Sequence, residues 1–320
     1  MSFGFSRTDG SQLATWWWSV DRWLLIAVMT LILCGTMLVA AASPAIAERL
    51  RLPWFYFILR HLFYLVPTVG LIIAFSVMSP RVLRRTAILL FLVTLGLLAL
   101  VPLIGSELNG ARRWVSLGGF SLQPSEFIKP CFAVMAAWLF ASQHRDRSFP
   151  GYMTSCILYA LIVGLLLLQP DLGMTIIVSF VWAIQFFMAG LPLSIVAILF
   201  VLFVVGLFGI YMTFPHVSSR IDRFLDPNKG DTYQVDRSLE AFRNGGFFGT
   251  GPGQGEIKRV LPDAHADFIF AVAGEEFGLI LTALLVMLFG FIIWRGMQRA
   301  RASDNLFVML AVSGLLAQFG

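Results

Sequence analysis

The stretch LPDAHADFIFAVAGEEFGLILTALLVMLFGFIIW, residues 261–294, joins an acid-rich entrance to a long apolar run. From about residue 267 the run is long enough to cross the roughly 30 Å hydrocarbon core of a bilayer as a helix. Five titratable side chains lie at its entrance or in its first turns: Asp263, His265, Asp267, Glu275 and Glu276. The stretch therefore predicts a membrane span whose entrance carries chemistry.

The composition of the whole chain agrees with a membrane protein. Of the 320 residues, 58% are hydrophobic and only 13% are charged, and the mean hydropathy is +0.82. Soluble globular domains are far less apolar, which argues against a soluble protein with a large core. The pI of about 9.4 does not indicate nucleic-acid binding, because membrane proteins carry Lys and Arg for orientation. Three scattered cysteines and four scattered histidines predict neither a disulfide framework nor a metal site.

Nine apolar segments predict an all-α polytopic membrane protein that forms one transmembrane domain over residues 1–320. They lie at about 22–42, 55–78, 86–104, 122–142, 152–169, 171–189, 192–214, 267–294 and 304–320. If residues 1–21 form a cytoplasmic tail, the arginine clusters at 80–85, 144–147 and 295–301 all fall on the cytoplasmic side. The long connection 215–266 then lies on the outer face, before the eighth segment. Because the chain ends inside an apolar run, we also expect at least one further span in a longer natural sequence.

Many cations fall on the outer side, where membrane orientation gives them no purpose. They are Arg112, Arg113, Arg220, Arg223, Lys229, Arg237, Arg243, Lys258 and Arg259. Those in the long loop can pair with acids of the same loop or can bind a ligand, and both interpretations stay open. Arg112 and Arg113 lie in a shorter loop beside a span, which favours an anionic ligand for them.

The segment NGARRWVSLGGFSLQPSEFIKP, residues 109–130, predicts non-helical backbone between two spans. Pro124 and Pro130 bracket a predicted re-entrant turn that carries Glu126 and Lys129. Residues three apart on a helical turn share a face, so these two side chains can pair. The pair is either a structural ion pair or, with the two arginines, part of an anion site, since an unpaired ion at membrane depth is costly.

Two further interruptions are rich in turn-forming residues. In QPDLG, residues 169–173, Pro170 ends a helix, and Asp171 is a candidate helix N-cap or a member of a polar site. The segment FRNGGFFGTGPGQGEIKR, residues 242–259, is glycine-rich and lacks the lysine spacing of a nucleotide-binding P-loop. It is interpreted as a flexible covering loop or as a phosphate-facing loop.

The acids of the first stretch are predicted to have separate roles. A helix that starts between Asp263 and Asp267 would place Glu275 about 80° around the axis and roughly 12 Å along it from Asp267, with Glu276 on the opposite side. These acids cannot then form one compact carboxylate pair of the glycosidase type. We expect a helix cap at Asp263, a reachable base at Asp267, and deeper glutamates that orient groups or pair with cations of neighbouring spans.

Three segments, GARRWVSLGGFSLQPSEFIKP, QPDLG and PDAHADFIFAVAGEEFGL, resemble in this order the SEDS family (shape, elongation, division and sporulation proteins) over essentially the whole chain. The PDAHADFIF segment resembles the cell-division branch more than the elongation branch. The resemblance implies ten spans with both termini in the cytoplasm. It also implies a peptidoglycan glycosyltransferase that polymerises lipid II in the bacterial inner membrane at the division septum. The implied partners are a class B penicillin-binding transpeptidase and other divisome membrane proteins.

The resemblance places the family's essential aspartate at Asp267, and its glutamate and lysine at Glu126 and Lys129. We expect inverting transfer in which Asp267 takes the proton of the acceptor hydroxyl while a polyprenyl pyrophosphate leaves. Cations of the outer side would stabilise that leaving group, with a divalent cation such as Mg²⁺ or Mn²⁺ as a further candidate. The expected substrate-binding residues are Arg112, Arg113, Glu126, Lys129, Asp171, Arg243, His265, Glu275 and Glu276.

Two other functions fit the same residues, a lipid II flippase and a non-enzymatic division scaffold. A flippase should carry comparable polar sites on both faces of the membrane, whereas the polar residues here cluster on one predicted face. A scaffold predicts that the polar outer site is dispensable.

Overall fold

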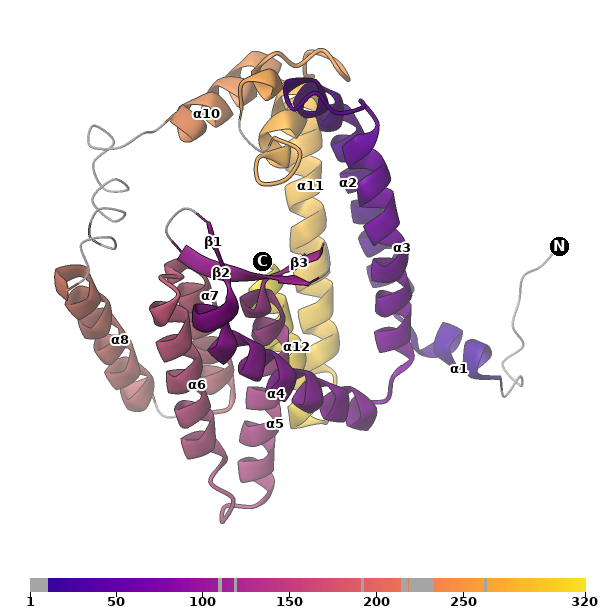
Figure 1. Cartoon of the computed structure of the whole chain (residues 1–320). Helices are drawn as coiled ribbons and strands as arrows, with labels where there is room; N and C mark the ends of the chain where they lie inside the picture. Colours follow the sequence, from indigo (N-terminus) through magenta and orange to yellow (C-terminus); the bar gives the residue numbers. More distant parts are fainter. Residues whose placement is uncertain are drawn as a thin grey trace. The chain divides into compact units, whose positions relative to one another are not determined.

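The computed structural model describes residues 11–108, 111–117, 120–190, 193–213, 218, 233–261 and 264–320. The chain is predominantly helical and forms two compact units (Figure 1). One unit joins Met1–Val77 to Asp222–Ile292, and the other joins Met78–Ile221 to Ile293–Gly320. The first is called the loop unit and the second the bundle unit below.

Every predicted apolar segment coincides with a helix. The helices are α1 (Gln12–Ser19), α2 (Arg22–Arg49), α3 (Tyr56–Val77), α4 (Pro80–Ile104), α5 (Pro124–Arg145), α6 (Gly151–Leu168), α7 (Leu172–Met188), α8 (Leu193–Thr213), α10 (Tyr233–Gly245), α11 (Ile269–Arg301) and α12 (Leu306–Phe319). Within the described residues, α2, α3, α4, α6 and α11 are long and apolar enough to cross a membrane, and α7 and α12 are shorter apolar helices. The helical membrane class is thereby confirmed, while the number of spans and the sidedness of the 215–266 connection stay predictions.

A small sheet accompanies the helices, and the sequence did not predict it. Strands β1 (Ser106–Leu108), β2 (Ala111–Leu117) and β3 (Phe120–Leu122) pair antiparallel in the order β1-β2-β3. They follow α4 and precede α5, where non-helical backbone was expected. Antiparallel pairing supplies partners for backbone groups that would otherwise lack them near a membrane. The predicted turns at Asn109-Gly110 and Gly118-Gly119 lie outside the described residues.

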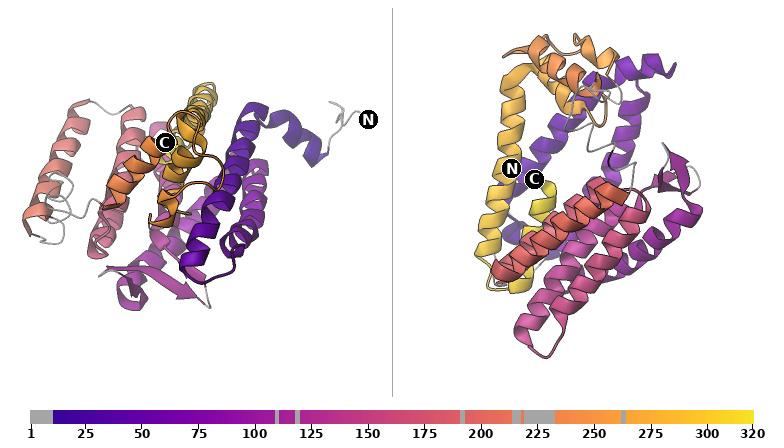
Figure 2. Two further views of the ribbon diagram at one scale, coloured as in Figure 1. Left: turned by 90° about the horizontal axis from the view of Figure 1, so that it is seen from above. Right: turned by 90° about the vertical axis from the view of Figure 1, so that its left-hand side faces the viewer.

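In the bundle unit, α4, α6, α7 and α12 surround α5, and Figure 2 shows the strands at one end of these helices. Gln185 of α7 is fully buried and donates to the carbonyls of Ala133 on α5 (2.8 Å) and Leu310 on α12 (3.0 Å). A Cβ on Gly314 would lie 2.3 Å from Gln185 Nε2, so a larger residue there would displace the buried amide. In a lipid bilayer the hydrophobic effect does not drive helices together, so small residues and interhelical hydrogen bonds stabilise their packing.

The loop unit contains α2, α3, α10, the short 3₁₀ helix η2 (Ile257–Arg259) and the first part of α11. No residue of α3 is buried, and its apolar side chains such as Phe63 and Val66 are widely exposed, as expected of a surface that faces lipid. The core of this unit lies under the loop instead. One apolar cluster consists of Ala42, Ile46, Ala241, Leu261, Ala264, Ala271 and Val272, and a second consists of Leu38, Ala273 and Leu285.

Helix α11 differs from the predicted continuous helix in two ways. It begins at Ile269, so Asp267 lies in the preceding turn, residues 264–268, and the helical angle predicted between Asp267 and Glu275 is wrong. The turn is held against the rest of the unit, because Ala264 is buried and the ring of His265 lies 4.3 Å from that of Phe57 on α3. The helix is also broken at Gly278, whose φ of 77° and ψ of −178° are not helical. The predicted cap at Asp263 lies outside the described residues.

Candidate functional site

The predicted site residues divide between the two units. Five of them, Arg112, Arg113, Glu126, Lys129 and Asp171, belong to the bundle unit. The loop unit holds the others: Arg243, His265, Asp267, Glu275 and Glu276. Each group is therefore described within its own unit.

Arg113 connects the sheet to the corner between α6 and α7. Its guanidinium donates to the carbonyl oxygens of Gln169 (3.3 Å) and Pro170, and Nη1 lies 3.9 Å from Asp171 Oδ1. Because Pro170 ends α6, the carbonyls at this corner lack helical N–H partners. The guanidinium group of Arg113 donates hydrogen bonds to them instead. Arg113 thus has an internal structural role in addition to the predicted anion-binding one.

Asp171 is the N-cap of α7, as one of the two interpretations predicted. Its Oδ1 accepts from the backbone N–H of Met174 at 3.4 Å, and the residue is only 4% exposed. Gln123, just before α5, donates to Asp171 Oδ2 at 3.5 Å and to Ser125 Oγ at 3.0 Å. The cap therefore joins the corner to the start of α5.

Glu126 and Lys129 pair as the spacing predicted, with 2.7 Å between Oε2 and Nζ. They lie in a continuous helix rather than in a re-entrant turn, which corrects that expectation. The reason is that Pro124 occupies the first position of α5, where a missing N–H has no cost, and Pro130 is tolerated within the helix. The Lys129 side chain is 11% exposed and that of Glu126 is 47% exposed. The polar residues of segments 111–117, 123–129 and 169–171 are called the polar cluster of the bundle unit below, and Gln123 joins Asp171 to the helix that carries the Glu126–Lys129 pair.

Among the other predicted outer cations that the structure describes, Arg112, Arg237, Arg243 and Arg259 are partly or fully exposed, whereas Lys258 is buried. Arg112 is exposed and donates to the carbonyl of Pro102 at 3.3 Å. Arg243 is exposed at the end of α10. On the same helix Arg237 pairs with Glu240, which is the loop-internal pairing considered for these cations. The corresponding residues at 219–232 lie outside the described residues.

The glycine-rich loop is bound to the break in α11. The carbonyls of Glu275 and Glu276 accept from the N–H groups of Thr250 (2.9 Å) and Gly251 (3.0 Å). In return, the N–H of Leu279, just after the break, donates to the Gly246 carbonyl at 2.9 Å. A broken helix exposes backbone groups that need partners in a membrane protein, and the loop provides them.

Glycine is required where loop and helix backbones touch. A Cβ on Gly245 would lie 2.0 Å from the Gly274 carbonyl oxygen, and one on Gly249 would lie 2.2 Å from the Glu276 carbonyl oxygen. Gly249 also has a φ of +84°, which side-chain-bearing residues rarely adopt. The glycines therefore allow the loop backbone to pack closely on α11. Neither the flexible covering loop nor the phosphate-facing loop considered from the sequence included this role.

Lys258 of this loop and Glu276 of α11 form a buried ion pair. The side chains are 5% and 0% exposed, and Lys258 Nζ also donates to the Ala41 carbonyl of α2 at 3.0 Å. Glu276 Oε2 accepts from the N–H of Gly253 at 2.9 Å. The expectation that the glutamates pair with cations of neighbouring spans is corrected for Glu276, whose cation comes from the loop.

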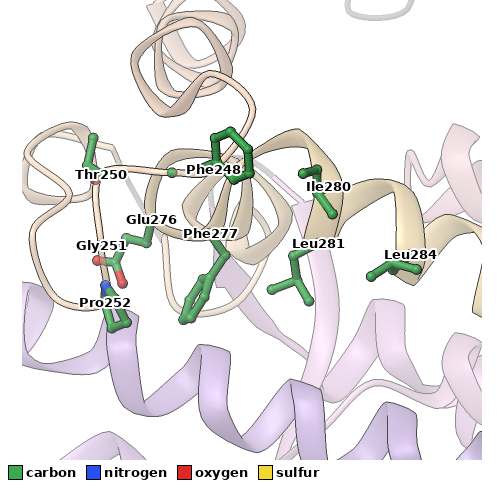
Figure 3. Close-up of a pocket in the computed structure, with 10 residues that line it drawn as sticks. Phe248, Thr250, Gly251, Pro252, Glu276, Phe277, Ile280, Leu281 and Leu284 are labelled. Carbon is green, nitrogen blue, oxygen red and sulfur yellow. The ribbon is translucent and has the colours of Figure 1, made fainter.

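A groove of 570 Å³ lies at the same break (Figure 3). Its apolar lining comes from the loop and from both sides of Gly278: Phe248, Pro252, Phe277, Ile280, Leu281 and Leu284. Glu276 is directed toward the loop at Gly251 and Pro252, where its carboxylate is already bound. The groove therefore suits hydrocarbon rather than sugar.

Asp267 is an exposed acid of the loop unit. It lies in the turn 264–268, between buried Ala264 and the start of α11. His265, two residues earlier, is half-buried against Phe57, so it holds the turn to α3. The reachable carboxylate that the sequence predicted is thus present, on a turn that is anchored on both sides.

No group of three or more His, Cys, Asp or Glu side chains within the described part of the chain could hold a metal ion. The residues present therefore do not build a protein-ligated cation site there. A divalent cation such as Mg²⁺ or Mn²⁺ stays a prediction.

Comparison with known proteins gives the family. A family model for the FtsW/RodA/SpoVE cell cycle proteins matches residues 22–319. The chain belongs to this family. The FtsW/RodA/SpoVE assignment confirms the resemblance, the polytopic membrane class and the enzyme class, a glycosyltransferase.

Two curated relatives illustrate the similarity. The probable peptidoglycan glycosyltransferase FtsW of Caulobacter vibrioides is 41% identical over 317 residues, which cover 99% of this chain and 81% of the relative. The protein of the same name from Coxiella burnetii is 37% identical over 318 residues, covering 95% of this chain and 84% of the relative. The similarity to FtsW confirms the resemblance to the cell-division branch.

Solved structures of FtsW/RodA/SpoVE-type folds match as well. A chain from a study of how a peptidoglycan synthase complex coordinates polymerization and crosslinking matches with a TM-score of 0.73 and 29% identity, covering 94% of this chain and 84% of that one. The rod shape determining protein RodA of Thermus thermophilus matches with a TM-score of 0.66 and 27% identity, covering 94% and 82%.

The sequence did not predict three residues that connect the glycine-rich loop to α11. Lys258 was grouped with the cations of the outer side without a role of its own, although it forms a buried ion pair, and Asn244 and Gly278 were not singled out. Gly278 lies two residues after a pair of glutamates inside an apolar run, which is a signal for a helix break. This signal could have located the part of α11 to which the glycine-rich loop binds.

Proposed function

We propose that this chain polymerises lipid II, an undecaprenyl-pyrophosphate disaccharide peptide, into glycan strands at the outer face of the bacterial cytoplasmic membrane during septal wall synthesis. Relatives that cover nearly the whole chain bear the name peptidoglycan glycosyltransferase FtsW, which supports this substrate class. The observation that carries the proposal is the exposed Asp267 carboxylate on its anchored turn.

In the proposed reaction, the acceptor sugar's 4-hydroxyl oxygen forms a bond to the donor's anomeric carbon. The bond from that carbon to the pyrophosphate oxygen breaks, and Asp267 takes the hydroxyl proton. The pyrophosphate leaves as an anion, so no second carboxylic acid has to protonate it. General-base help of this kind contributes about 10²- to 10⁴-fold, and positioning with charge stabilisation supplies the rest.

The polar cluster of the bundle unit supports the charge-stabilising part of the proposal. Lys129 is held by Glu126, and Arg113 is held by the α6–α7 corner, so both cations have fixed places. Pre-oriented charges stabilise a developing anion better than mobile ones, because they need no reorganisation. Arg112 and Arg243 are exposed and are proposed as further phosphate contacts. None of these proposed steps uses a metal ion. Measuring polymerisation with Mg²⁺, with Mn²⁺ or with a chelator tests separately whether a divalent cation is needed.

A class B penicillin-binding transpeptidase is proposed as the partner, with other divisome membrane proteins at the septum. The solved neighbour from a complex that couples polymerization to crosslinking supports such an arrangement.

The reaction class is tested by supplying labelled lipid II to the purified protein together with that transpeptidase. Glycan polymer on a gel is the expected product. Movement of the lipid between leaflets without polymer would favour a flippase, and neither activity would favour a scaffold.

A further inference from the structure

The Glu275 carboxylate is an acceptor for four donors inside the protein. Its Oε1 accepts from the N–H groups of Glu256 (2.9 Å) and Ile257 (2.9 Å) and from Asn244 Nδ2 (3.0 Å). Its Oε2 lies 3.3 Å from the N–H of Lys258. Three of these donors are consecutive backbone amides at the start of η2, and a carboxylate is a strong partner for such amides.

The donors and the carboxylate enclose a loop of chain that contains Asp267. The backbone amides at 256–258 are 17 to 19 residues from Glu275, and Asp267 lies roughly midway between them. Inside the enclosed segment, Leu261, Ala264 and Ala271 are buried in one apolar cluster. Asp267 is exposed at the turn between those anchors.

We propose that Glu275 is a positioning residue for the glycosyl transfer: its carboxylate clamps the amides of residues 256–258 and so fixes the turn that presents Asp267. The proposal rests on the proposed function, because it assigns Glu275 an effect through Asp267. Glu275 is 0% exposed and has no surface for substrate, so direct binding of substrate does not explain it. A buried carboxylate without partners would be strongly destabilising, whereas this one has all its neighbours in place.

The clamp leaves almost no room around the carboxylate. A Cβ on Gly255 would lie 2.7 Å from Glu275 Oε2 and 3.0 Å from its Cδ. The clamp can therefore be disturbed from the loop side by Gly255→Ala, with the glutamate itself intact.

The first test compares Glu275→Gln with the wild-type protein and with Glu240→Gln, an exposed carboxylate of α10 in the same unit. An amide keeps one acceptor but turns a donor toward the Lys258 N–H. We expect kcat to fall about 10- to 100-fold with KM nearly unchanged, since small misplacement of a reacting group costs about this much. Hydrogen exchange in residues 264–268 should rise at the same time, and Glu240→Gln should change neither quantity. Unchanged exchange in 264–268, or unchanged kcat, in folded Glu275→Gln protein would overturn the proposal.

Gly255→Ala is the second test, and it still tests the proposal if the Glu275→Gln protein does not fold. Its control is Gly290→Ala, where a Cβ meets nothing within 4 Å. Gly255→Ala should lower kcat and raise exchange in 264–268, and Gly290→Ala should do neither. Wild-type kcat in folded Gly255→Ala protein, or a fall that Gly290→Ala reproduces, would contradict the clamp.

The failure of this proposal is distinct from failure of the proposed base. If Asp267→Asn retains wild-type turnover, the base assignment fails whatever the exchange data show. If Asp267→Asn is inactive while Glu275→Gln turns over normally with unchanged exchange, only the positioning role is wrong. Combining Glu275→Gln with Asp267→Glu provides a coupling measurement, and non-additive losses are expected if Glu275 acts through Asp267.

Discussion

The ammonium group of Lys258 and the carboxylate of Glu276 pair in a region where the two side chains are 5% and 0% exposed. This pair joins the glycine-rich loop to α11, and the bond from Lys258 to the Ala41 carbonyl extends the connection to α2. The loop is therefore connected by buried contacts to two helices of its unit.

Replacing Lys258 by methionine should destabilise the protein by about 3–5 kcal/mol, because it leaves a buried carboxylate without its cation. Thermal unfolding of the detergent-purified protein measures the effect. Arg259→Met, which removes the adjacent exposed cation, is the matched control and should change the melting temperature little. A Lys258→Met protein that melts like the control would show that the pair contributes nothing to stability.

The break in α11 should not tolerate a side chain. At Gly278 a Cβ would lie 2.4 Å from both Gly249 N and the Phe247 carbonyl oxygen, in a backbone region that is essentially restricted to glycine. Gly278→Ala should cost at least about 1–3 kcal/mol from the backbone alone. Gly35→Ala on α2, where a Cβ meets nothing within 4 Å, controls for the substitution itself. Equal expression and melting of the two variants would argue for a continuous helix.

Arg113 and Arg112 should differ in their effect on stability. Arg113→Ala removes the donors to the Gln169 and Pro170 carbonyls and the cation near Asp171, which should destabilise by about 1–3 kcal/mol. Arg112→Ala removes an exposed side chain that donates to the Pro102 carbonyl, and the loss of stability should be smaller. The two melting temperatures decide the matter, and an equal or reversed order would contradict the structural role of Arg113.

Lys129 and Glu126 should differ in their effect on turnover. An ion pair with one partner 47% exposed contributes at most about 1 kcal/mol to stability, so neither substitution should unfold the protein. If Lys129 stabilises the leaving pyrophosphate, Lys129→Met should lower polymerisation by about tenfold or more, and Glu126→Gln should lower it less. Full activity of Lys129→Met would remove that residue from the site.

The parts of the structure that follow from local sequence signals could be predicted. Apolar length located the helices, the spacing of three placed Glu126 against Lys129, and Pro170 followed by Asp171 marked a helix end and a new cap. The three strands between residues 106 and 122 were not predicted. They are short and largely polar, so they lack the apolar alternation that marks a strand in a sequence.

The clamp on Glu275 could not be predicted for a different reason. It joins a side chain to backbone amides 17 to 19 residues away, and backbone amides leave no signature in a sequence. Helix α11 begins only at Ile269, so geometry that assumed a helix through Asp267 misplaced the two glutamates relative to Asp267.

The central claim is that the Asp267 carboxylate takes the acceptor proton. The most direct measurement is the rate of glycan polymerisation by purified Asp267→Asn protein with its transpeptidase partner and labelled lipid II. Asp304→Asn, which alters an exposed aspartate between α11 and α12, is the matched control. We expect Asp267→Asn to polymerise at least about 100-fold more slowly than wild type, within the range of general-base catalysis, and Asp304→Asn to keep the wild-type rate. Polymer formation by folded Asp267→Asn protein at the wild-type rate would contradict the claim.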